Sequence, residues 1–309
     1  MSEAEPLVAG VELGGTKCIA VIARGRDIVS RAQWPTGDDP AVTLGAIARW
    51  LDGKARDHRF AALGVASFGP LRLDKRAVDY ACILNTPKPG WSGTDILAGL
   101  ADCFEGPIAV DTDVAGAALA EGRWGAAIGC ASHVYLTIGT GIGGGFVING
   151  QPLHGTLHPE MGHVRVRRAP GDCFAGVCPV HGDCLEGLAS GPAIAARAGQ
   201  PADTLAADHP VWLQIAEEIA DLMASLILML APHRIIIGGG VGQGQPDLLA
   251  LIHQATERTL GGYLPGNDLP TLDALIVHPK FGAEAGVYGA IALALDELAR
   301  PRNPLCLKG

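Results

Sequence analysis

The chain has 309 residues, of which 48% are hydrophobic and 18% charged, and its formal net charge is −9. This composition predicts a globular protein with a sizeable core, long enough for two domains. The negative charge argues against non-specific binding to nucleic acid or to an anionic membrane surface, so neither partner is expected.

The distribution of cysteines and the length of the apolar stretches indicate in which cellular compartment the protein is expected. Three of the eight cysteines, Cys173, Cys178 and Cys184, crowd into one segment, and the others are scattered in mostly apolar contexts. This is no disulfide framework and fits a reducing cytosol. The acidic N-terminus lacks a signal-peptide pattern, and the apolar stretch 222–231 is too short to span a bilayer. We therefore expect a cytoplasmic protein.

The first expected strands, 7–13 and 18–23, are joined by the turn Gly14-Gly15-Thr16-Lys17. Such a turn offers backbone N–H groups and a hydroxyl, which can form a nest for phosphate. An ordinary hairpin turn would look similar. A Walker loop is excluded, because its glycine and lysine spacing is missing and no helix follows.

Two aspartates follow a short strand expected at 107–110. Before it, the apolar spacing predicts a helix at 41–51 and a buried strand at 61–68. Asn85 opens a Pro-rich loop and is a candidate sugar contact, although from composition alone a plain surface loop is the more common outcome. Asp111 and Asp113 lie between the strand and a helix expected at 114–121. Carboxylates in that position bind ligands in α/β proteins, or else cap the helix.

A second strand–glycine–strand unit begins with the strand expected at 133–138. It enters the run Gly139-Thr140-Gly141-Ile142-Gly143-Gly144-Gly145 and continues as a strand over 146–148. The likeness to the first hairpin indicates an internal duplication with two phosphate-binding turns. Because a strand and not a helix follows, a Rossmann dinucleotide site is disfavoured.

A third glycine cluster, 238–242, follows a strand expected at 233–237 and contains Gly239 and Gly240. It could accept a base and ribose, or simply let a strand and a helix pack closely. Helices are expected at 190–198, 212–230, 248–260 and 285–298, and a strand at 275–278. Strands that alternate with helices predict a doubly wound α/β architecture.

Four residues of zinc-ligand type, His163, Cys178, His181 and Cys184, lie in a loop-like segment flanked by Glu160 and Glu186. Four nitrogen and sulfur ligands are typical of a closed, tetrahedral structural zinc site. The alternative without a metal is that the cysteines are small buried hydrophobic residues. Cys173 is a fifth candidate ligand, and the sequence does not decide its role. We expect the metal to fold the loop that carries the two glutamates.

Together these motifs resemble the ROK (repressor, open reading frame, kinase) sugar kinases over almost the whole chain. The segment 12–17 resembles the first phosphate hairpin of that family and 139–145 the second. Asp113 falls on the catalytic aspartate, 160–163 on the sugar motif Glu-x-Gly-His, and 184–186 on the end of the zinc signature. Glu12 in place of the usual Asp, the loop 86–91 and the spacing Cys-Pro-x-His-Gly-x-Cys are similar to the fructokinase branch.

The resemblance implies an actin/hexokinase-like (ribonuclease H-like) α/β fold with a duplicated core and an interdomain cleft that closes on substrate. It implies a small domain over residues 1–118, joined by a terminal helix at 286–300, and a larger domain over 119–285 with the zinc loop at 163–184. A homodimer is also implied. Members that act as regulators carry a helix-turn-helix before the first hairpin, and only six residues precede it here.

The implied activity is ATP-dependent phosphorylation of D-fructose to fructose 6-phosphate, a phosphotransfer to an alcohol group. Its cofactors would be Mg²⁺ with ATP and a structural Zn²⁺. Asp113 would be the base, and the implied phosphate contacts are Gly14, Gly15, Thr16, Lys17, Gly139, Thr140, Gly141, Gly143, Gly144, Gly239 and Gly240. The implied hexose contacts are Asn85, Asp113, Glu160, His163 and Glu186. The alternatives are a mannokinase or broad hexokinase or glucokinase, a non-catalytic sugar-binding regulator, and a zinc hydrolase.

Overall fold

The computed structural model describes residues 5–263 and 270–300, and the chain divides into two compact units. The N-terminal unit comprises the described parts of residues 1–120, 154–158 and 286–309. The C-terminal unit comprises the described parts of residues 121–153 and 159–285. Each unit is built on one five-stranded sheet.

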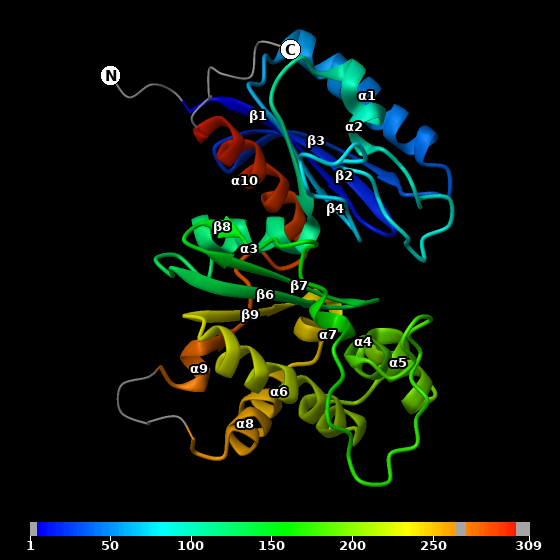
Figure 1. Cartoon of the computed structure of the whole chain (residues 1–309), viewed down its shortest axis with the longest axis vertical. Helices are drawn as coiled ribbons and strands as arrows, with labels where there is room; N and C mark the ends of the chain where they lie inside the picture. Colours follow the sequence, from blue (N-terminus) through cyan, green and yellow to red (C-terminus); the bar gives the residue numbers. More distant parts are fainter. Residues whose placement is uncertain (1–4, 264–269, 301–309) are drawn as a thin grey trace. The chain divides into compact units, whose positions relative to one another are not determined.

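The sheet of the N-terminal unit has the order β3-β2-β1-β4-β5 (Figure 1). Strands β1 and β2 form an antiparallel hairpin, β2 pairs antiparallel with β3, and β4 and β5 continue parallel to β1. The bounds are Leu7–Leu13, Lys17–Arg24, Asp27–Pro35, Leu63–Ser67 and Ile108–Thr112 for β1 to β5. The edge strand β3 alternates exposed and half-buried residues, and no strand was expected there.

Helices cover both faces of this sheet. On one face, α1 (Pro40–Asp57) packs Leu44 and Ile47 against alternate residues of β1, together with the short helix α2 (Ile96–Leu100). On the other face, α10 (Ala285–Ala299) approaches β1 and β4 closely, because Gly10 and Gly64 leave room for its backbone. Helix α3 (Asp113–Trp124) follows β5 directly, and η1 (Ala101–Cys103) extends α2.

The sheet of the C-terminal unit repeats this topology. Its order is β10-β9-β6-β7-β8, in which the antiparallel hairpin β6–β7 again lies beside the parallel strands β9 and β10. The bounds are Ser132–Ile138, Ile142–Ile148, Gln151–Pro152, Arg234–Gly238 and Ile276–Val277 for β6 to β10. The duplication inferred from the two glycine hairpins is therefore visible as two sheets of the same order.

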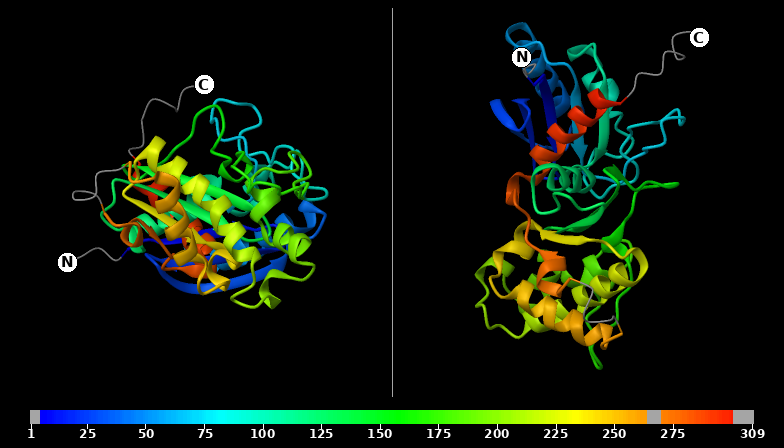
Figure 2. Two further views of the ribbon diagram at one scale, coloured as in Figure 1. Left: turned by 90° about the horizontal axis from the view of Figure 1, so that it is seen from below. Right: turned by 90° about the vertical axis from the view of Figure 1, so that its left-hand side faces the viewer.

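The long helices α6 (Val211–Leu230) and α8 (Leu248–Leu260) pack on one face of this second sheet (Figure 2). Shorter helices complete the unit: α4 (Leu185–Ala189), α5 (Gly191–Ala198), α7 (Gly239–Gly244), α9 (Leu272–Leu275), η2 (Met161–His163), η3 (Ala202–Thr204) and η4 (Gly282–Glu284). Among the described residues, no helix combines the length and the apolar character that crossing a bilayer requires.

Candidate functional site

The first glycine turn joins β1 to β2 and is held by a residue outside it. Gly14 N–H donates to the Lys17 carbonyl at 3.0 Å. Thr36, which is buried, donates its hydroxyl to the Gly14 carbonyl and its N–H to the Thr16 carbonyl. Gly15, Thr16 and Lys17 are exposed. The turn is thus fixed through its carbonyl groups, while the residues at its tip face solvent.

Sequence reasoning missed Thr36, because a threonine after an unpredicted edge strand carries no distinctive signal. Its hydroxyl also lies 3.4 Å from the thiol of the buried Cys18. The neighbouring residue Gly37 accepts a hydrogen bond from the indole of Trp91 at 3.0 Å. The Pro-rich loop is therefore fastened to the chain that supports the turn. Asn85, at the start of that loop, is exposed.

The second glycine turn is short, and it is held by a hydrogen bond from a residue that lies later in the chain. Gly139 N–H donates to the Gly141 carbonyl at 2.9 Å, and Gly191 N–H donates to the Gly139 carbonyl at 2.7 Å. Glu186 accepts the N–H of Ile142 at 3.0 Å. Glu186 is therefore bonded to the first residue of β7, directly after the glycine turn.

Two other glycines of this run lie in strand β7 and not in the turn. Gly143 and Gly144 pair with residues of β6, so they form part of the sheet ladder. The α-carbon of Gly144 faces the side chain of Met161. The structure therefore gives Gly144 a packing role, and the turn proper consists of residues 139–141.

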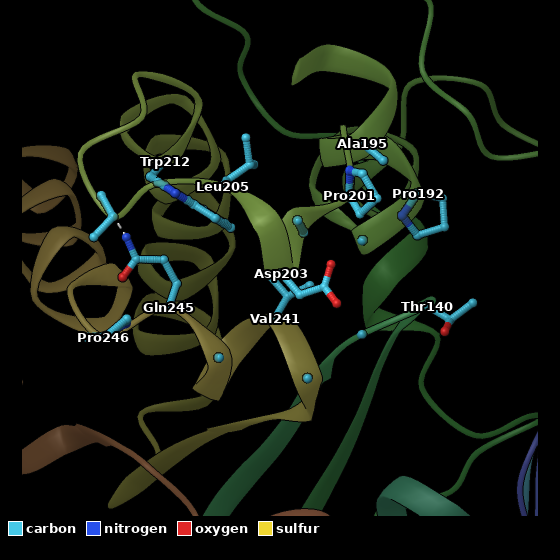
Figure 3. Close-up of a pocket in the computed structure, with 16 residues that line it drawn as sticks. Thr140, Pro192, Ala195, Pro201, Asp203, Leu205, Trp212, Val241, Gln245 and Pro246 are labelled. Atoms are coloured by element: carbon cyan, nitrogen blue, oxygen red, sulfur yellow. Dashed lines mark hydrogen bonds between the residues drawn. The ribbon is translucent and has the colours of Figure 1, made fainter. Parts of the chain in front are cut away.

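A cavity of about 590 Å³ opens beside this turn in the C-terminal unit (Figure 3). Gly139, Thr140 and Gly240 line it, as do residues of α5, η3, α6 and α7 that sequence reasoning did not single out. Leu205, Trp212 and Val241 give it an apolar wall. A cavity of this size, with an apolar wall next to a turn of backbone N–H groups, suits an aromatic ligand that carries phosphate.

Gly239 has a steric role beside the cavity. Its φ of +87° favours glycine, and a Cβ there would overlap the backbone of Ile138. The close packing of strand and helix, one of the two interpretations of the third glycine cluster, therefore applies at Gly239. Gly240, with nothing near its α-carbon, lines the cavity.

Asp113 stands at the corner where β5 ends and α3 begins. Thr112, and not Asp111, caps the helix, since its hydroxyl accepts the N–H of Ala115 at 3.1 Å. The interpretation of Asp111 as an N-cap was therefore wrong. Asp113 accepts the N–H of Val114 at 2.9 Å. One of its two oxygens is thus fixed by the backbone.

The pKa of Asp113 is raised to about 6 by burial, an effect that the N–H donors of Val114 and of Asp113 itself only partly oppose. A carboxylate with a pKa near the working pH can both accept and release a proton efficiently. Perturbed carboxylates of this kind cluster at functional sites. The geometry and the pKa together make Asp113 a candidate general base.

The four expected metal ligands do converge. One ligand atom from each of His163, Cys178, His181 and Cys184 lies within 4.8 Å of all the others. His163 Nδ1 is 3.5 Å from the Cys184 sulfur and 3.8 Å from the Cys178 sulfur, and His181 Nδ1 is 3.7 Å from the Cys178 sulfur. Tetrahedral zinc, with Zn–S near 2.3 Å and Zn–N near 2.0–2.1 Å, implies separations of roughly 3.6 Å. The donor set and its spacing therefore fit zinc.

Cys173, the fifth candidate, does not belong to this group. It is exposed, and its sulfur lies near the Gly171 carbonyl at 3.5 Å. His163 turns Nδ1 toward both sulfurs, so the geometry leaves Nε2 as the ring atom for another contact.

A buried ion-pair network fastens the loop to α5 and α6. Arg197, whose side chain is 6% exposed, contacts Asp172 at 3.3 Å and Glu218 at 2.6 Å. Its guanidinium also lies 4.5 Å from the ring centre of Phe174. Burial raises the pKa of Glu218 to about 7, against the opposing effect of Arg197. Sequence reasoning missed this network, because its members are far apart in the chain.

The sugar motif of the sequence begins at Glu160, which is exposed, and continues into η2. Gly162 is buried, and a Cβ there would overlap the carbonyl of Ile142 in β7. The requirement for glycine at this position is therefore steric, because only glycine lets the motif lie against the strand. This contact places Glu160 and His163 beside the second glycine hairpin.

Gly162→Ala is accordingly expected to displace the motif. Overpacking of a buried position costs about 1–3 kcal/mol, so we expect a lower melting temperature. If the motif binds the sugar, as its resemblance to the sugar motif implies, KM for the sugar should rise about tenfold, with a smaller effect on KM for the nucleotide. Gly45→Ala is the matched control, because a Cβ at Gly45 in α1 meets nothing within 4 Å. Steady-state kinetics and thermal unfolding test this, and unchanged sugar affinity in a folded Gly162→Ala protein would contradict it.

Comparisons with known proteins agree with these features. The ROK family profile matches residues 8–297. The fructokinase of Zymomonas mobilis is 41% identical over 92% of this chain and 95% of its own, and that of Pediococcus pentosaceus 37% identical over 93% and 97%. The ROK hexokinase of Thermus thermophilus superposes with a TM-score of 0.77 at 28% identity, over 95% of this chain and 99% of its own. A ROK family glucokinase from Streptomyces griseus, in complex with glucose and AMPPNP, superposes with a TM-score of 0.72 at 26% identity. The match covers 94% of this chain and 99% of that protein.

Proposed function

Because this chain belongs to the ROK family, we propose that it transfers the γ-phosphoryl group of ATP to the 6-hydroxyl of D-fructose. The observation that carries the choice of sugar is the similarity to proteins named fructokinase, at 34–41% identity. Proteins named glucokinase are more distant, at 28%. The fold is that of the actin-like sugar kinases, as the superpositions with ROK hexokinase and glucokinase show.

The nucleotide is assigned to the cavity of the C-terminal unit and to the glycine turn beside it. The adenine would lie against the apolar wall of Leu205, Trp212 and Val241, and the phosphates would reach the N–H groups of the turn 139–141. The exposed tip of the first turn, Gly15 to Lys17, would supply further phosphate contacts. Mg²⁺ would accompany ATP, since phosphoryl transfer depends on positioning and on neutralising the developing charge.

Asp113 is assigned the role of general base. Its ionised carboxylate would accept the proton of the attacking hydroxyl, which requires that it lie within hydrogen-bond reach of the bound sugar. Glu160, His163, Glu186 and Asn85 are the proposed contacts to the sugar hydroxyls. Of these, Glu186 already accepts one hydrogen bond from Ile142, which leaves one carboxylate oxygen for a second partner.

Zinc is assigned to His163, Cys178, His181 and Cys184. When bound, the ion supplies no reacting group, because protein ligands fill a four-coordinate site. It would close the loop, and it would hold the ring of His163 through Nδ1. Such occupation of all four positions counts against a zinc hydrolase, which needs an open coordination position.

Steady-state kinetics with a panel of hexoses tests this proposal against its nearest alternatives, mannokinase and broad hexokinase or glucokinase. With saturating ATP and Mg²⁺, we expect the highest kcat/KM for fructose among fructose, mannose, glucose and N-acetylated hexoses. A higher value for mannose or glucose would replace fructose as the substrate. Tight sugar binding without any ADP formation would favour the non-catalytic regulator.

A further inference from the structure

The five residues His154–His158 belong by their contacts to the N-terminal unit, although the chain on both sides belongs to the C-terminal unit. Two histidine side chains fix this segment. His154 Nε2 lies 2.8 Å from Asp111 Oδ2, and His158 Nε2 accepts the N–H of Leu71 at 3.0 Å. His158 is buried, and Asp111 has a side chain that is only 9% exposed. These are specific contacts made by otherwise irregular chain.

His154 is connected to Asp113 through Asp111 and Thr112. Asp111 uses its second oxygen, Oδ1, to accept the N–H of Thr112 at 2.7 Å. Thr112 in turn uses its hydroxyl to cap α3, and Asp113 accepts the N–H of Val114. Thr112, the residue that precedes Asp113, is therefore held by Asp111 through its N–H and by the helix cap through its hydroxyl.

We propose that His154 and Asp111 act together as positioning residues for Asp113. The proposal rests on the proposed function, in which Asp113 is the base. His154 pins Oδ2, so that Oδ1 stays on the Thr112 N–H and the β5–α3 corner keeps one orientation. A misplacement of a reacting group by about 1 Å can cost about 100-fold in rate.

The burial of Asp111 and the hydrogen-bonding capacity of histidine explain the pairing, in which the His154 side chain itself is 29% exposed. A buried carboxylate oxygen without a hydrogen-bond donor costs free energy. Removal of His154 therefore favours rotation of the Asp111 side chain toward water. Neutral histidine can donate through Nε2, and protonated histidine donates through both ring nitrogens. The bond is therefore compatible with either charge state of His154.

A double-mutant cycle with His154→Ala, Asp111→Ala and both together tests the pair. We expect each single change to lower kcat for fructose phosphorylation by about 10- to 100-fold, with KM for ATP within about threefold of the wild type. The melting temperature should fall by only a few degrees, because the group left without its partner costs about 1–3 kcal/mol. The double variant should lose no more than the worse single variant, because the two residues act as one unit. His278→Ala, at an exposed histidine, is the matched control and should be unchanged.

Asp111→Asn distinguishes positioning from charge. Asparagine can still accept the Thr112 N–H and donate to His154 through its amide, so we expect it to recover most of the activity that Asp111→Ala loses. If Asp111→Ala does not fold, His154→Ala and Asp111→Asn still decide the question. A folded His154→Ala enzyme with kcat within about threefold of the wild type would overturn the inference, as would losses that multiply in the double variant.

Asp113→Asn, measured in the same assay, separates this inference from its premise. An inactive Asp113→Asn with a fully active His154→Ala would refute only the positioning role. An active Asp113→Asn would refute the role of Asp113 as base, and the inference with it.

Discussion

Asp113→Asn is expected to lower kcat by about 10²- to 10⁴-fold, the usual contribution of a general base. Asparagine keeps the size of the side chain and can still accept the Val114 N–H through its carbonyl oxygen. It cannot accept a proton from the sugar hydroxyl. The fold and the KM for ATP should therefore change little, and Asp113→Ala should behave in the same way.

The pH dependence gives an independent test of the same role. Burial raises the pKa of Asp113 to about 6, so the carboxyl group binds a proton as the pH falls through that value. Since only the ionised form can act as base, kcat/KM for fructose should be level above about pH 7 and should fall about tenfold per pH unit well below pH 6. A profile that stays flat down to pH 5, or substantial turnover by Asp113→Asn, would remove Asp113 as the base.

The second large effect is expected at the metal site. Cys184 is fully buried, lies directly before α4, and contributes a sulfur to the four-ligand group. Cys184→Ser should lower the zinc content from about one per chain to near zero. It should also abolish most activity, because the loop between η2, which contains His163, and α4, which contains Glu186, loses its closure. Cys173→Ser is the matched control and should keep both metal and activity, because Cys173 lies outside the group.

The loss of zinc should also destabilise the fold. A ligand present at a thousand times its dissociation constant stabilises by about 4 kcal/mol, and 1 kcal/mol shifts the melting temperature of a domain of this size by about 2–4 °C. We therefore expect a decrease of roughly 10 °C in Cys184→Ser. Elemental analysis and thermal unfolding measure the two effects. A folded, active Cys184→Ser, or wild-type protein that is folded and active without zinc, would refute the structural zinc.

Much of the fold could be predicted from the sequence, because the two glycine hairpins and the strands around them follow local rules. Apolar runs that end in glycine gave β1, β2, β6 and β7, and the likeness of the hairpins gave the duplication. The edge strand β3 was missed, because its residues alternate in exposure with little apolar character. At the third glycine cluster, α7 contains four glycines, and no propensity argument predicts a helix there.

Of the candidate site, the sequence could indicate residues whose chemistry is distinctive, such as the four zinc-type ligands and Asp113. It could not indicate residues whose role depends on a partner far along the chain. Thr36 supports the first turn across 22 residues, Arg197 contacts Glu218 across 21, and His154 meets Asp111 across 43. The N-cap is Thr112 and not Asp111, because α3 begins at Asp113, one residue earlier than the sequence indicated, and Asp111 accepts the N–H of Thr112 instead.

Analysis of the reaction product by ³¹P and ¹³C NMR tests the central claim most directly. With D-fructose, ATP and Mg²⁺, the wild-type protein should form ADP and one sugar phosphate in equal amounts, with the phosphorus coupled to carbon 6 of fructose. Phosphorus on another carbon, or ADP and inorganic phosphate without a sugar phosphate, would contradict the account.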